Sequence, residues 1–94
     1  IGLTILFELI FSSKSKKFIK RCDEKTRRIL ELALKEISIN PYPAKDFDFQ
    51  KVAGENNTYR IRVSTNRIVY EVNTQEKVIK IIRLERRKDR TYHF

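Results

Sequence analysis

Arginines that alternate with apolar residues are the first feature of this sequence that could do chemistry. Arg60 and Arg62 alternate with the apolar and aromatic residues of 59–63, and Arg67 begins the next apolar stretch. Guanidinium groups stay charged at physiological pH and bind phosphate oxygens in a bidentate manner. Like charges on neighbouring strands repel each other, so packing alone does not account for this cluster. The pattern therefore predicts a surface that holds a polyanion backbone.

More basic and aromatic side chains follow toward the end of the sequence. Tyr92 and His93 supply a hydroxyl and an imidazole there, and aromatic rings beside arginines suit stacking on unpaired bases. The plainer alternatives are a solvated sheet face at Arg60 and Arg62, a flexible basic tail over 86–90, and a frayed chain end. The residues predicted to bind RNA are Lys51, Arg83, Arg86, Lys88, Arg90 and His93.

Composition narrows the class of partner. The sequence has 94 residues and a net charge of +9, because 21 Lys and Arg outnumber 12 Asp and Glu. Such an excess favours nucleic acid, an acidic membrane or an acidic protein. A chain of this length predicts one domain over residues 1–94.

The remaining composition excludes several kinds of site. A single cysteine, Cys22, allows no disulfide within the chain, which fits a reducing cytoplasm. With one histidine and one cysteine, we expect no metal site, and no phosphate-binding glycine loop or other cofactor motif is present. The apolar N-terminal stretch is too short to span a bilayer and Glu8 interrupts it, so no membrane segment is expected.

Hydrophobic periodicity predicts the elements that position these residues. We expect a strand over 3–11 and a helix over 13–22 that is capped by Ser12 or Ser13. A second helix is capped by Asp23, carries an apolar stripe on one face and ends at the Asn40-Pro41 pair. A loop with a short strand near 49–52 follows. Three clearer strands then come at 59–63, 67–73 and 78–84, joined by links short enough for hairpins.

The predicted fold class is α+β. It consists of an N-terminal strand, two packed helices, a three-stranded antiparallel meander forming one sheet, and a short C-terminal basic tail. Two helices on one side of the sheet would leave its other side open. If Ile61, Ile68 and Tyr70 point at the helices, strand alternation sends the arginines at 60, 62 and 67 to the open side.

Five segments, in their order and spacing, resemble the RelE/ParE superfamily of toxin–antitoxin toxins, nearer RelE than ParE. They are FSSKSKKFIKR at 11–21, KVAG at 51–54, YRIRV at 59–63, NRIVYEV at 66–72, and the basic stretch to Tyr92. The resemblance covers about residues 10–92. It implies the toxin of a type II system, which enters the ribosomal A site and cleaves mRNA there without a metal. It also implies attack of the 2′-hydroxyl on the adjacent phosphate, and a RelB-like antitoxin as partner.

The resemblance also assigns residue roles. Arg60 and Arg62 match two family lysines, Arg67 matches a family arginine, and Arg86 or Arg87 matches another near the end. The catalytic set implied in this way is Arg60, Arg62, Arg67, Arg87 and Tyr92. Arginine in place of lysine is a departure, because arginine does not readily give up its proton and is a poor general base. The alternatives for the base are Tyr92, His93 and Lys51, or the strand arginines act only as charge stabilisers.

Other functions stay open at this point. The lysine-to-arginine departures also fit a ParE-like inhibitor of a topoisomerase, or a catalytically weak protein that binds RNA or the ribosome. A third alternative is a pure protein-interaction module whose exposed apolar residues, such as Leu32, contact an antitoxin.

Overall fold

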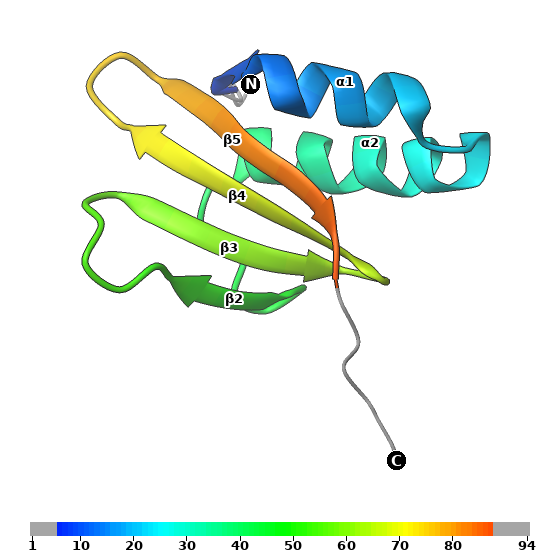
Figure 1. Cartoon of the computed structure of the whole chain (residues 1–94). Coiled ribbons are helices and arrows are strands. Elements are labelled where there is room, and N and C mark those ends of the chain that lie inside the picture. The colour runs from blue at the N-terminus through cyan, green and yellow to red at the C-terminus, as the bar shows by residue number, and fades with distance from the viewer. Residues whose placement is uncertain (1–5, 88–94) are drawn as a thin grey trace, which may run out of the picture.

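The computed structural model describes residues 6–87, which form one strand, two helices and then four more strands (Figure 1). The elements in chain order are β1 (Glu8–Phe11), α1 (Ser13–Arg21), α2 (Glu24–Ile39), β2 (Asp48–Lys51), β3 (Thr58–Val63), β4 (Asn66–Asn73) and β5 (Val78–Arg86). The predicted α+β class is confirmed, as are both helices and the three later strands. Of the strand predicted over 3–11, residues 1–5 lie outside the described part, and the observed strand begins at Glu8.

The sheet differs from the predicted three-stranded meander. It has five strands in the order β1-β5-β4-β3-β2, and it is mixed, because β1 runs parallel to β5 while the other neighbours are antiparallel. The edge segments β1 and β2 were predicted as strands, but the prediction that only three strands form the sheet was wrong. Parallel pairing joins segments that are far apart in sequence, so no local pattern identifies the partner of β1.

Side chains at the helix ends explain where the helices begin. Ser12 is the N-cap of α1 and accepts a hydrogen bond from the backbone N–H of Ser15, which decides between the two predicted caps. Asp23 caps α2 by accepting from the backbone N–H of Thr26. Hydrogen bonding from the side chain of Thr26, and then from its backbone N–H, lowers the pKa of the Asp23 carboxyl. The helix α2 ends at Ile39, and its C-cap Asn40 lies directly before Pro41, where the helix was predicted to end.

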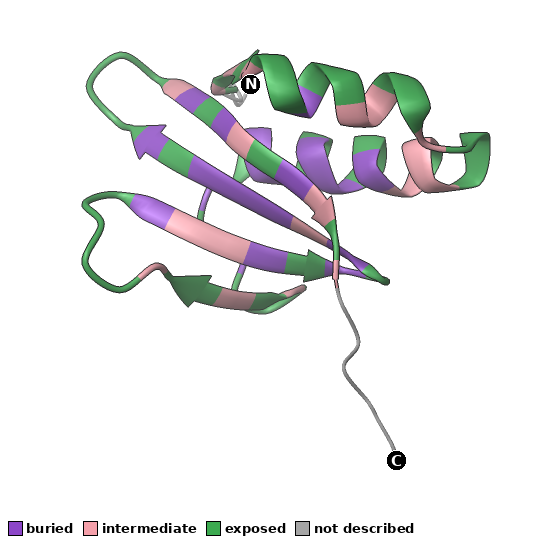
Figure 2. Cartoon of the chain, viewed as in Figure 1, coloured by how far each residue is buried: buried purple, intermediate pink, exposed green. Residues whose placement is uncertain are grey.

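Both helices lie on the same side of the sheet, and the core fills the space between the helices and the sheet (Figures 1 and 2). The buried residues of α2 are Leu30, Ala33, Leu34, Ile37 and Ser38. They pack against fully buried sheet residues that include Ile61, Ile68 and Tyr70. The predicted orientation of these three residues is confirmed. Leu32 lies off the buried stripe and is 64% exposed.

A bulge in β5 controls which side chains reach the open side of the sheet. On β4 the adjacent residues Val69 and Tyr70 pair with Arg83 and Ile81, so Ile82 is an extra residue on β5. The bulge reverses the alternation, and therefore Ile81 and Leu84 are both buried while Arg83 is exposed. Ser12 donates its Oγ hydrogen to the carbonyl of Ile82 at 2.8 Å, which ties the start of α1 to this bulge.

Candidate nucleic-acid interface

The side of the sheet away from the helices carries a cluster that we call the arginine face. Its residues are Arg60, Arg62, Arg67, Arg83, Asp48, Gln50, Val69 and Glu85. The strand register places Asp48, Arg62, Arg67 and Glu85 in one row across β2, β3, β4 and β5. The next row is Gln50, Arg60, Val69 and Arg83. The structure thus brings together the three strand arginines singled out from the sequence. Arg83, which the sequence analysis placed among the RNA-binding residues, joins them.

Carboxylates at both ends of the first row pair with the arginines between them. Arg62 lies 3.3 Å from a carboxylate oxygen of Asp48, and Arg67 lies 3.1 Å from one of Glu85. The Nε of Arg83 is 3.7 Å from the second oxygen of Glu85. These ion pairs are partly exposed, so each contributes little to stability and leaves the guanidinium open to exchange with another anion. Sequence reasoning missed both carboxylates, because only the strand register shows that they lie beside the arginines.

The side chains of the arginine face leave little of the strand surface beneath them exposed. Arg60 donates a hydrogen bond from Nη2 to the side-chain oxygen of Gln50 on the neighbouring strand. Val69 is only 6% exposed although it lies on the side away from the helices, so the side chains around it cover it. Long arginine stems cover apolar surface in this way while their charged ends stay in water. The charged ends of these arginines therefore lie at the surface of the sheet, above a buried apolar residue.

The structure separates the two arginines at the end of β5. The backbone N–H of Arg87 donates to the carbonyl of Thr65 at 2.7 Å, and its Nη1 donates to the carbonyl of Ser64 at 3.4 Å. Arg87 therefore lies beside the hairpin that joins β3 and β4. Arg86 instead lines a hollow with residues of the α1–α2 junction, where its charge also lowers the pKa of Asp23. Of the pair, Arg87 is the one that lies near the arginine face.

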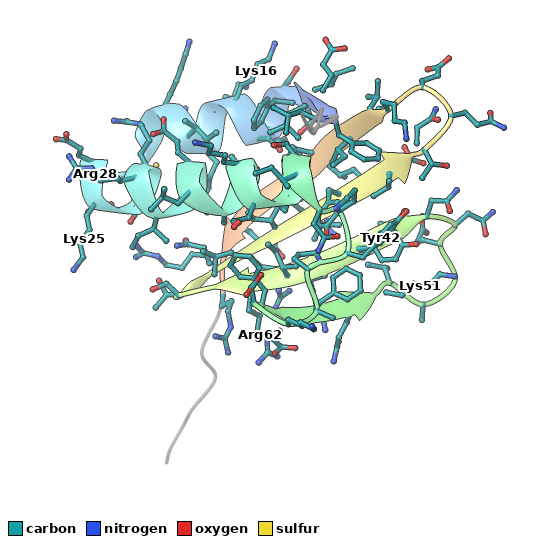
Figure 3. All side chains as sticks on the ribbon, turned by 180° about the vertical axis from the view of Figure 1, so that it is seen from behind. Lys16, Lys25, Arg28, Tyr42, Lys51 and Arg62 are labelled. Atoms are coloured by element: carbon teal, nitrogen blue, oxygen red, sulfur yellow. The ribbon has the colours of Figure 1, made fainter. Side chains whose placement is uncertain are left out.

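Lys51 does not join the arginine face. It pairs with Tyr59 and shares its side of β2 with Phe49, whose ring stacks on Tyr59 with centroids 5.3 Å apart. This is the side that faces the helices. Figure 3 shows Lys51 near Tyr42 and away from Arg62. The other predicted site residues, Lys88, Arg90, Tyr92 and His93, lie outside the described residues.

Two further features bear on the kind of site. Within residues 6–87, no three His, Cys, Asp or Glu side chains come together in a way that could hold a metal ion. Neither of the helices is long and apolar enough to cross a membrane, over the same part of the chain.

Comparison with known proteins decides the family. The sequence of residues 9–91 matches the protein-family model described as the ParE toxin of the type II toxin–antitoxin system, parDE. The chain belongs to the RelE/ParE toxin family. The toxin is also 29% identical over 55 residues to a provisionally named toxin RelE1 of Methanocaldococcus jannaschii, covering 58% of this chain and 61% of that protein. It therefore spans less than two thirds of the length of this curated relative.

Solved structures share the fold of the toxin. A chain of the archaeal RelE–RelB complex from Pyrococcus horikoshii superposes with a TM-score of 0.77 at 26% identity, over 90% of this chain and 97% of that one. A chain of the RelB–RelE antitoxin–toxin complex from Methanococcus jannaschii gives a TM-score of 0.66 at 27% identity, over 82% of this chain and 88% of that one. The predicted resemblance to RelE/ParE toxins is confirmed.

Proposed function

We propose that this toxin is a ribosome-dependent endonuclease that cleaves mRNA in the A site without a metal ion. The 2′-hydroxyl of one nucleotide attacks the adjacent phosphate, which leaves a cyclic phosphate and a 5′-hydroxyl end. The toxin acts in the cytoplasm, because its target is the translating ribosome. This is the RelE-like activity within the family, and the proposal rests on the arginine face.

The observation that carries the proposal is the placement of four arginines on one open sheet surface. Arg62 and Arg67 are direct cross-strand partners, and Arg60 and Arg83 lie in the next row on either side of Val69. Guanidinium groups placed side by side in this way stabilise the charge that develops on phosphorus during the attack. Removal of one such donor typically costs a factor of about 10² to 10³ in rate.

The decisive experiment is ribosome toeprinting in a cell-free translation system. The wild-type toxin is expected to create new mRNA ends at A-site codons, and Arg67→Ala is expected to lower the cleavage rate about 100-fold. Arg28→Ala is a matched control, because Arg28 lies on α2 and its side chain is 73% exposed. No new ends with wild type, or equal cleavage by Arg67→Ala, would contradict the proposal.

We also propose that a RelB-like antitoxin neutralises the toxin by covering the outer surface of α2. Exposed Leu32 and Ile39 lie there in shallow grooves that also include Ile29 and the stems of lysines and an arginine. Solved relatives of this fold are complexes of RelE with RelB, which motivates the choice of partner. Antitoxins of this kind are partly disordered alone and bury apolar surface when they wrap around the toxin.

This partner can be tested with a neighbouring reading frame that encodes a small acidic protein. Co-expression should restore growth and allow co-purification with the wild-type toxin. Leu32→Glu should abolish co-purification. Lys16→Glu on α1 makes a larger change of charge and should leave co-purification intact. Co-purification that survives Leu32→Glu would place the antitoxin elsewhere.

A second candidate function is inhibition of a topoisomerase, as in ParE. It is favoured by the ParE description of the matching family model and by Arg60 and Arg62 standing where RelE-like toxins have lysines. A supercoiling assay with purified gyrase separates the two candidates. Inhibition of gyrase with no mRNA cleavage would select this second function. Binding of RNA in a filter assay without cleavage would instead indicate a protein that only binds RNA.

A further inference from the structure

The carboxylate of Glu85 lies beside two arginines at the β5 end of the arginine face. Glu85 is the cross-strand partner of Arg67, and it follows Arg83 by two residues on the same strand. One carboxylate oxygen is 3.1 Å from Nη1 of Arg67, and the other is 3.7 Å from Nε of Arg83. Arg87 follows Glu85 by two residues and lies beside the adjoining hairpin. The side chain of Glu85 is 36% exposed, so an RNA substrate can reach it.

The proposed reaction needs a proton acceptor, and the arginines cannot supply one. Attack on phosphorus requires removal of the proton from the 2′-hydroxyl, and a guanidinium has no acceptor site at physiological pH. Lys51 lies on the opposite side of the sheet. Asp48 stands on the edge strand β2 and pairs with Arg62 alone. Among the described residues, Glu85 is the carboxylate that contacts two guanidinium groups of the arginine face.

We propose that Glu85 is the general base of the cleavage reaction, an inference that rests on the proposed endonuclease function. The carboxylate of Glu85 takes the proton from the 2′-hydroxyl as the bond from the 2′-oxygen to phosphorus forms. The bond from phosphorus to the 5′-oxygen breaks, and the leaving 5′-oxygen takes a proton from water. Glu85 then returns its proton to water. No net water is consumed, and the products are the cyclic phosphate and the 5′-hydroxyl end.

The surrounding charges make this role physically reasonable. A lone carboxylate would repel the phosphate, but Arg67 and Arg83 on either side of Glu85 attract it and offset that repulsion. The hydrogen bond from Arg67 to Glu85 also restrains the orientation of the carboxylate. The same guanidinium can contact a phosphate oxygen, so the base and the charge stabiliser stay within one hydrogen bond of each other. Such positioning is what an oriented proton transfer requires.

The test separates chemistry from binding. Glu85→Gln keeps the shape and an oxygen that accepts from Arg67, but removes the basic carboxylate. Single-turnover cleavage on programmed ribosomes is expected to fall at least about 100-fold, within the range usual for loss of a general base. Affinity for the ribosome should be unchanged or higher, because a negative charge is removed. Glu71→Gln is the matched control. Glu71 is exposed on the same side of the sheet as Glu85, but its cross-strand neighbour on β5 is Lys80, away from the arginine pairs.

A second variant guards against a purely structural role. Glu85→Ala should lose cleavage in the same way and regain part of it when formate is added, since formate can replace the missing carboxylate. Cleavage by Glu85→Gln within threefold of wild type would overturn the inference, and so would loss of cleavage by Glu85→Ala that formate does not restore. Both outcomes presuppose cleavage by wild type, whereas failure of the endonuclease function itself appears as absence of that cleavage.

Discussion

The hydroxyl of Tyr70 offers a measurable test of how the sheet is tied to the segment after α2. Tyr70 is fully buried, and its hydroxyl donates a hydrogen bond of 2.7 Å to the carbonyl of Pro41. Tyr70→Phe removes one hydroxyl and leaves that carbonyl unpaired. We expect the free energy of unfolding to fall by about 1 kcal/mol at neutral pH. For a domain of this size, that corresponds to a decrease in Tm of about 4–8 °C.

The buried hydroxyl of Tyr70 also predicts that the free energy of unfolding depends on pH. Burial raises the pKa of Tyr70 well above its ordinary value of 10.0. Because the folded state holds the proton more tightly, the stabilisation is fully present below about pH 10, where tyrosine is protonated in the unfolded chain too. Above about pH 10 it declines by about 1.4 kcal/mol per pH unit. The stability advantage of wild type over Tyr70→Phe should therefore shrink and then reverse by about pH 11.

Urea unfolding followed by circular dichroism at pH 8, 10 and 11 measures both effects. Tyr42→Phe is the control, because Tyr42 belongs to the same aromatic cluster but is 42% exposed. This control should change the free energy of unfolding by less than about 0.5 kcal/mol. Equal effects of the two variants at pH 8, or a difference between wild type and Tyr70→Phe that is constant up to pH 11, would refute the reasoning.

Three further predictions concern the arginine face and its support. Arg62→Ala should reduce the salt dependence of binding to a single-stranded RNA by about 0.7 in the slope of log K against log salt, measured by filter binding, because one phosphate contact is lost. Asp48→Asn should raise RNA affinity about two- to fivefold in the same assay, because Asp48 no longer competes with phosphate for Arg62; weaker binding would contradict this. Ser12→Ala should lower the free energy of unfolding in urea by about 1–2 kcal/mol, because it removes the N-cap of α1 and the bond to Ile82.

Much of the fold follows from local patterns in the sequence. The apolar stripe of α2 with its cap at Asp23 and its end at Asn40 depends on interactions within a few residues, and both ends were predicted. The strands around Ile61 and Ile68 follow from alternation with a period of two residues. That alternation also predicted that Arg60, Arg62 and Arg67 would point away from the helices.

Only part of the candidate site could be predicted from such local patterns. Strict alternation along β5 from buried Ile79 and Ile81 would put Arg83 and Glu85 in the core. The bulge at Ile82 reverses that alternation, and it is formed by pairing with β4. A sequence pattern in one strand contains no information about an irregularity that arises between two strands.

By itself the sequence determined the strand and helix types, the charge of the open side, and the family that its ordered segments resemble. Only the tertiary structure decided that β1 pairs with β5, that Arg86 and Arg87 lie in different surroundings, and that carboxylates stand beside the arginines. The physical reason is the range of the interactions. Propensity, capping and alternation act over a few residues, whereas register, bulges and cross-strand ion pairs depend on contacts between segments far apart in the chain.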